Sequence, residues 1–245
     1  IPDCNMDVLR GVYAYGFENP SPIQQKAIPP MVDRRDMIAQ AQSGTGKTGA
    51  FTVGTLNIID TSKKTTQAIV MAPTRELAMQ ISNVFINIGS YLKDYKVQLL
   101  VGGNSVDEDI KKLKDKEGPP SVIVGTPGRI HDMIRRNILK TSSIKLLILD
   151  EADEMLSIGF KDQVYSIFQN LNNDIQVGLF SATIPDELTT LTEKFMRNPV
   201  KILVKSDMLT LEGISQYYVA IEDDEQKYTG TIFLETHFNL RRCRR

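Results

Sequence analysis

The residues with the clearest chemical potential lie in the segment 41–48, which reads Ala-Gln-Ser-Gly-Thr-Gly-Lys-Thr. A short apolar run, 37–39, precedes this segment, and a stretch that can form a helix follows it. A glycine-rich loop between a strand and a helix directs backbone N–H groups at anionic oxygens, where the helix dipole also favours negative charge. The segment therefore predicts a loop that binds the phosphates of a nucleotide.

Individual residues of this loop suit different parts of a nucleoside triphosphate. The glycines allow the backbone to close around phosphate oxygens, Lys47 places a positive charge near the β- and γ-phosphates, and the Thr48 hydroxyl can ligate Mg²⁺. Ala41 stands where the usual pattern has its first glycine, and we expect this small residue to serve there. The predicted nucleotide-binding residues of the loop are Ser43, Gly44, Thr45, Gly46, Lys47 and Thr48.

Two adjacent acids, Asp150 and Glu151, follow the apolar run 146–149. We expect Asp150 to hold Mg²⁺ through water, and Glu151 to orient or deprotonate the attacking water. Acids at a helix start are also favoured by the helix dipole alone. The order of phosphate loop, apolar strand and acid pair nevertheless favours a nucleoside triphosphatase. The predicted catalytic residues are Lys47, Asp150 and Glu151, and the predicted metal ligands are Thr48 and Asp150.

Short apolar, β-branched runs alternate with segments of helical periodicity. Predicted strands cover 37–39, 68–71, 97–101, 122–124, 146–149, 177–180 and 200–204. Predicted helices cover 49–59, 75–91, 106–114, 128–137, 161–170 and 186–197. Nearly continuous apolar strands separated by helices indicate an α/β fold, with a parallel sheet and helices on both faces. The loops after the strands then meet at one edge of the sheet, where ligands bind.

Composition describes an ordinary globular protein, with 41% hydrophobic and 24% charged residues among 245. No run of 18 apolar residues and no basic-then-apolar leader is present, so we expect neither membrane insertion nor secretion. Cys4 and Cys243 lie near opposite ends and suggest a reducing, intracellular compartment. Because the net charge is −1, any nucleic-acid site should be local, with a shallow salt dependence.

The regular α/β pattern ends near residue 204 and predicts three parts of the chain. Residues 1–204 form the nucleotide-binding domain, the polar segment 205–213 forms a linker, and 214–245 begin a second domain that is cut short. The basic tail 237–245 fits nothing before it. Three explanations stay open for this tail: a truncated end, an RNA-binding segment, or a sequence that is not contiguous in this region.

Several motifs together resemble the DEAD-box RNA helicases, in particular their N-terminal RecA-like domain, which is a P-loop nucleoside triphosphatase fold. Asp150-Glu151-Ala152-Asp153 matches the signature of this family. Residues 16–24 resemble the Q motif, which implies that Phe17 and Gln24 bind the nucleotide and that Gln24 reads the adenine edge. Each remaining motif is weak alone, but their common order supports the resemblance.

The resemblance also implies residues that contact RNA or couple RNA to the nucleotide. In this family, Ser-Ala-Thr at 181–183 links ATP hydrolysis to unwinding through the last aspartate of the signature, Asp153. Taken alone, Thr74 is explained as a helix N-cap and Arg129 as part of a salt bridge on its helix. Arg75 either grips a phosphate or braces the site. The implied residues are Pro73, Thr74, Arg75, Gly102, Gly103, Thr126, Pro127, Gly128, Arg129, Asp153, Ser181 and Thr183.

Within the family, the chain is similar to the group of eukaryotic initiation factor 4A and its close paralogues. The similarity covers about 1–228 and includes the segments 13–17, 39–42, 154–156 and 209–214. It implies an ATP-dependent RNA helicase that uses ATP and Mg²⁺, contacts the RNA backbone without reading sequence, and acts in the cytoplasm as a monomer, with a scaffold of the initiation factor 4G type as a possible partner.

Alternatives stay open at this point: a nuclear RNA clamp of the exon-junction type, a non-catalytic RNA-binding adapter, and, less favoured, a DNA helicase. The family also uses an aromatic residue that would precede Ile1, and arginine fingers of a second domain, worth about 10³–10⁵ in rate. We therefore expect residues 1–245 alone to bind nucleotide weakly and to hydrolyse it poorly.

Overall fold

The computed structural model describes residues 4–115 and 117–203. The predicted linker, 205–213, and the predicted start of a second domain, 214–245, lie outside the described residues. The part of the chain that the sequence predicts to be a nucleotide-binding domain, 1–204, is described almost to its predicted end.

A seven-stranded sheet forms the centre of the described region, with the strand order β3-β4-β2-β5-β6-β1-β7 and every neighbouring pair parallel. All seven predicted strands are present, and the predicted parallel α/β fold is confirmed. Their bounds are β1 (Met37–Gln40), β2 (Ala68–Met71), β3 (Val97–Leu100), β4 (Val122–Gly125), β5 (Leu146–Asp150), β6 (Gln176–Ser181) and β7 (Val200–Leu203).

Helices connect the strands as predicted, although three more α-helices occur among the described residues than the periodicity indicated. The predicted helix over 75–91 ends earlier and continues as the 3₁₀ turn η1 (Gly89–Tyr91). The bounds are α1 (Met6–Ala14), α2 (Pro22–Val32), α3 (Lys47–Ile58), α4 (Arg75–Ile88), α5 (Val106–Leu113), α6 (Pro127–Arg135), α7 (Ala152–Ser157), α8 (Lys161–Gln169) and α9 (Asp186–Phe195).

Tertiary packing explains one of the unpredicted helices, α2. Pro29 and Pro30 lie inside its last turn, where proline normally argues against a helix because it lacks a backbone N–H. Met31 of the same turn packs directly on α3, since a Cβ at Gly54 would lie 2.8 Å from the Met31 sulfur. This close approach stabilises a helix that local sequence disfavours.

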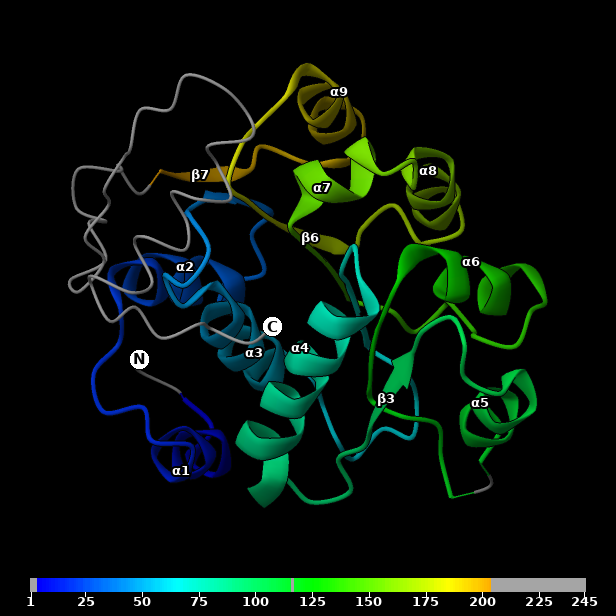
Figure 1. The fold of residues 1–245 in the computed structure, drawn as a ribbon. Helices are drawn as coiled ribbons and strands as arrows, with labels where there is room; N and C mark the ends of the chain where they lie inside the picture. Colours follow the sequence, from blue (N-terminus) through cyan, green and yellow to red (C-terminus); the bar gives the residue numbers. More distant parts are fainter. Residues whose placement is uncertain (1–3, 116, 204–245) are drawn as a thin grey trace, which may run out of the picture. The chain divides into compact units, whose positions relative to one another are not determined.

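Two apolar cores lie on opposite faces of the sheet, because successive strand residues point to alternate sides. Val70 and Ile148 pack with α1–α4, whereas Ile69 and Leu147 pack with α5–α9. Figure 1 shows these two groups of helices, the first coloured blue to blue-green and the second green to dark yellow. The predicted cover of helices on both faces is therefore confirmed.

The strand order divides the carboxyl edge of the sheet into two neighbouring groups of loops. The loops after β1, β5 and β6 lie together, and so do the loops after β2, β3 and β4. In a parallel sheet all strands end at the same edge, so both groups face the same side of the molecule.

None of the helices in the described ranges combines the length and the apolar character needed to cross a bilayer.

Phe51 joins three elements of the first core, and its truncation should reveal how much this contact contributes. Its ring lies 5.1 Å from that of Phe180 on β6 and 6.3 Å from that of Phe85 on α4, and it is fully buried. We expect Phe51→Ala to lower the free energy of unfolding by about 3–5 kcal/mol in urea titrations, because it leaves a cavity. Met79→Ala, on the exposed face of α4, should change it by less than about 0.5 kcal/mol. Equal losses in the two variants would contradict the central position of Phe51.

Candidate functional site

The glycine-rich loop connects β1 to α3 in the geometry that the sequence predicts. Gly44 and Gly46 adopt left-handed conformations, with φ of 81° and 96°, and Gly46 is the N-cap of α3. A Cβ at Gly46 would lie 2.9 Å from Nε2 of Gln24, so a side chain is disfavoured by space as well as by conformation. The loop therefore leads directly into the positive end of a helix, where an anion is favoured.

Lys47 bridges this loop to the end of β5. Its Nζ donates to the carbonyl oxygen of Ala41 at 2.8 Å and to Oε1 of Glu151 at 2.9 Å. The Lys47 side chain is 5% exposed and that of Glu151 is 19% exposed, so the ion pair is largely shielded from water. Residues 104 positions apart are thus brought into direct contact.

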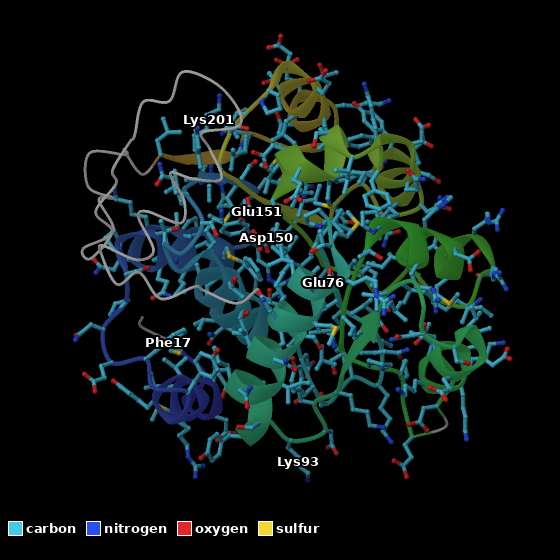
Figure 2. The ribbon with its side chains drawn as sticks, in the orientation of Figure 1. Phe17, Glu76, Lys93, Asp150, Glu151 and Lys201 are labelled. Atoms are coloured by element: carbon cyan, nitrogen blue, oxygen red, sulfur yellow. The ribbon has the colours of Figure 1, made fainter. Side chains whose placement is uncertain are left out.

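Asp150 is buried immediately beside this ion pair. Burial, followed by the negative charge of Glu151, raises the pKa of Asp150 to about 7, although the charge of Lys47 acts in the opposite direction. Glu151 itself adopts a left-handed conformation, with φ of 48° and ψ of 53°, which is uncommon for a side chain of this size. Figure 2 shows the two carboxylates together in the middle of the molecule.

These groups fit a magnesium ion that is held partly by phosphate. No cluster of three or more potential His, Cys, Asp or Glu ligands occurs in the part of the chain that the structure describes. Magnesium commonly uses only one or two carboxylates together with water and substrate phosphates. A bound cation would favour the ionised form of the buried Asp150 carboxylate. Thr48, the second predicted magnesium ligand, follows Lys47 in the first turn of α3.

A second carboxylate, Asp153, connects the end of β5 to the loop after β6. Its Oδ2 accepts hydrogen bonds from the Thr183 hydroxyl at 2.6 Å and the Thr183 N–H at 3.0 Å. Its N–H donates to the Ser181 hydroxyl at 3.2 Å. Burial acts to raise the pKa of Asp153, but hydrogen bonds from Thr183 and Ser181 outweigh it and lower that pKa. Gln40, at the end of β1, donates to the Ala182 carbonyl at 3.1 Å.

Gln24 and Phe17 lie against the glycine-rich loop and the first turns of α3. The Gln24 amide accepts from the Ser21 N–H at 2.9 Å and donates to the Gly46 carbonyl at 3.2 Å. A Cβ at Gly49 would lie 2.9 Å from the Phe17 ring. Phe17, Gln24 and Gly49 also line a cavity of about 180 Å³, and Figure 2 shows Phe17 on the side of the molecule where α1 lies.

The predicted RNA-contacting residues gather at the other group of loops, after β2, β3 and β4. Pro73 is buried, and the Thr74 hydroxyl caps α4 by accepting from the Leu77 N–H at 3.2 Å. Gly102 and Gly103 are exposed, as is Arg75. Thr126 and Pro127 are buried at the start of α6, followed by the half-buried Gly128.

The Arg129 guanidinium is bound by other groups of the protein and is not free to bind a phosphate. Its guanidinium forms an ion pair with Asp109 of α5 and donates to the Asn104 carbonyl at 2.9 Å, and its side chain is 9% exposed. The salt bridge that the sequence suggested therefore exists, but it joins two helices instead of lying along one. This network places Arg129 against the backbone of the loop that carries Gly102 and Gly103.

Sequence reasoning missed two residues of this site. Gln40 is the last residue of an apolar strand, and only the neighbouring β6 places the Ala182 carbonyl within its reach. Asp109 belongs to a charged helix start in which Asp107 has the same residue type. A burial pattern with a period of 3.6 was the available signal for Asp109, and it is weak in so short a helix.

A family model described as DEAD/DEAH box helicase matches residues 21–191. An ATP-dependent RNA helicase eIF4A from Phaeosphaeria nodorum is 56% identical over 221 residues, covering 90% of this chain and 55% of that protein. An ATP-dependent RNA helicase FAL1 from Mycosarcoma maydis is 54% identical over 222 residues, covering 91% and 55%. The chain thus spans about half the length of the curated relatives it matches.

Solved structures show the same relationship. A structure of Dbp5 from S. cerevisiae bound to RNA and ADP BeF3 has a TM-score of 0.82 and 34% identity, covering 95% of this chain and 58% of that chain. A DEAD box protein from Methanococcus jannaschii has a TM-score of 0.78 and 34% identity, covering 95% and 62%. Because the family model spans well over half of its residues, this chain belongs to the DEAD/DEAH box helicase family.

Proposed function

We propose that this chain carries the N-terminal ATP-binding domain of an ATP-dependent RNA helicase that acts in translation initiation. The observation that supports this most is the contact of Lys47 with Glu151, which lies next to buried Asp150. Lys47 is the first residue of α3, directly after the glycine-rich loop. This arrangement suits hydrolysis of a nucleoside triphosphate in a member of a helicase family. Relatives named as eIF4A, 54–56% identical, support the role in initiation.

In the proposed mechanism, the loop residues 43–48 hold the phosphates, and Gln24 and Phe17 define the adenine end of the site. Lys47 exchanges the Ala41 carbonyl for a phosphate oxygen, while Glu151 orients the attacking water and accepts its proton. Asp150 and Thr48 would hold Mg²⁺, which supplies positive charge to the phosphate oxygens when bound.

RNA binding is proposed at the second group of loops. N–H groups after Pro73, after Pro127 and in the exposed Gly102-Gly103 segment suit phosphate oxygens, which carry no sequence information. We propose that Asp153, with Ser181 and Thr183, couples the nucleotide site to the RNA site. These residues lie in the first group of loops, beside the acid pair, and β5 is the strand of that group that neighbours β2 of the second group. The similar structure of Dbp5 was solved with RNA bound, which supports the proposal that this domain binds RNA.

The remaining assignments concern the whole protein. We propose that 205–213 link the domain to a second RecA-like domain that begins within 214–245, and that efficient turnover needs that second domain. We also propose a monomer that works in the cytoplasm with an initiation factor 4G-type scaffold. Co-purification of exon-junction proteins in place of initiation factors would favour the nuclear alternative.

Replacement of Glu151 tests the proposed chemistry. In the full-length protein, we expect Glu151→Gln to reduce RNA-stimulated ATP hydrolysis by about 10²–10⁴, since the water loses its base, while ATP still binds. Glu154→Gln removes an exposed acid three residues later and should leave the rate within about twofold. Unchanged hydrolysis in Glu151→Gln would favour the non-catalytic alternative.

Burial of Asp150 predicts a dependence of stability on pH. Its pKa rises from 3.8 to about 7 in the folded state, so the folded chain binds the proton more tightly than the unfolded chain does. The free energy of unfolding therefore falls as pH rises from about 4 to 7. Without nucleotide, Asp150→Asn should be more stable than wild type at pH 8 by on the order of 1–3 kcal/mol, with a smaller difference at pH 5.

Urea unfolding at both pH values measures this effect. Asp162→Asn, an exposed acid in the first turn of α8, serves as the control and should show the same small change at pH 5 and pH 8. The same dependence on pH in both variants would argue that the burial of Asp150 is not its cause.

The Thr183 hydroxyl provides a test of coupling. Thr183→Val keeps the backbone N–H bond to Asp153 but loses the 2.6 Å hydroxyl bond. Loss of one bond to a charged group, about 1.5–3 kcal/mol, should lower the rate of RNA duplex separation by roughly tenfold or more, with little change in ATP affinity. Thr190→Val on α9 is the exposed control. Equal unwinding rates in both variants would remove Thr183 from the coupling.

A further inference from the structure

Two arginines from separate elements hold the exposed loop 102–105 that follows β3. A Cβ at Gly103, whose φ is +86°, would lie only 2.2 Å from Nη1 of Arg75, so this guanidinium packs directly on the loop backbone. From the other side, Arg129 of α6 donates to the Asn104 carbonyl at 2.9 Å. The position of the loop therefore depends on where these two guanidinium groups are held.

Asp109 determines the position of the Arg129 guanidinium. The carboxylate of Asp109 pairs with Nη1 of Arg129, and the two side chains are only 5% and 9% exposed. Gln98 of β3 donates to the Asp109 carbonyl at 3.2 Å and is 3.4 Å from its Oδ1. A buried arginine cannot turn outward to a phosphate without leaving a buried carboxylate unpaired, which is strongly unfavourable. Arg129 is thus committed to the interior contact.

We propose that Asp109 is a positioning residue of the RNA site, acting through Arg129 on the loop 102–105. The pair fixes the loop so that the exposed backbone of Gly102 and Gly103 presents its N–H groups to RNA phosphates. This inference rests on the proposed RNA-binding function and changes the role of Arg129 from a phosphate ligand to a support of the loop. It also assigns a function to Asp109, which has no role in the motifs.

Simple electrostatics predicts the opposite effect for this residue. A carboxylate near an RNA site repels phosphates, so its removal should strengthen binding if Asp109 acted only through its charge. If Asp109 holds Arg129 in place, its removal should weaken binding, because the loop loses its support. Asp107 is exposed in the same first turn of α5 and therefore reports the effect of charge alone.

The experiment compares full-length variants in binding to a fluorescein-labelled single-stranded oligouridylate, with a non-hydrolysable ATP analogue present. We expect Asp109→Ala to raise the Kd for RNA by about tenfold, as for loss of one charge-assisted contact. Asp107→Ala should bind equally well or slightly more tightly. Asp109→Glu, which keeps the carboxylate, should recover much of the affinity. Affinity for the ATP analogue should be unchanged in all three.

The outcomes separate the two proposals. If wild type binds no RNA, the proposed function itself fails. If wild type binds but Asp109→Ala behaves like Asp107→Ala or binds more tightly, the positioning role is wrong. Should Asp109→Ala not fold, Asp109→Asn decides the matter: it keeps the size of the side chain but loses the ion pair with Arg129, so weaker RNA binding supports the proposal and equal or tighter binding overturns it.

Discussion

The buried charge of Lys47 is the constraint on which the rest of the site depends. An ammonium group with 5% exposure needs a partner, because a buried charge without one is unfavourable by several kcal/mol. Glu151 supplies that partner, and the Ala41 carbonyl accepts a second hydrogen bond. The loop after β1 and the end of β5 are thereby held together, although β6 lies between these strands.

The end of β5 contacts two other loops of its own group, those after β1 and β6, and β5 is the strand of that group that neighbours β2 of the second group. Asp150 and Glu151 face the glycine-rich loop, whereas Asp153, one turn farther, holds the loop after β6 through Thr183. Because all these groups share one short segment, a change in the charge near Lys47 is placed to affect the Asp153 contacts. This is the physical basis for the proposed coupling between nucleotide and RNA.

The central strands β2 and β5 were predictable because they are buried on both faces and so read as unbroken apolar runs. The edge strands β3 and β7 are only partly buried. Several helices had a clear 3.6-residue period or a capping residue, such as Thr74. The helix α2 was not predicted because Pro29 and Pro30 oppose it locally, and α7 because six residues are too few for a period to show. Packing on α3 overrides the local preference in α2.

The sequence by itself determined the family, the parallel fold, and the residue types of the proposed nucleotide site, because these depend on short contiguous motifs and their order. Only the tertiary structure decided which distant groups meet. Gln24 meets the Gly46 carbonyl, and Arg129 pairs with Asp109 in place of an acid on its own helix. Local sequence carries no record of such partners, since strand order and helix packing bring them together.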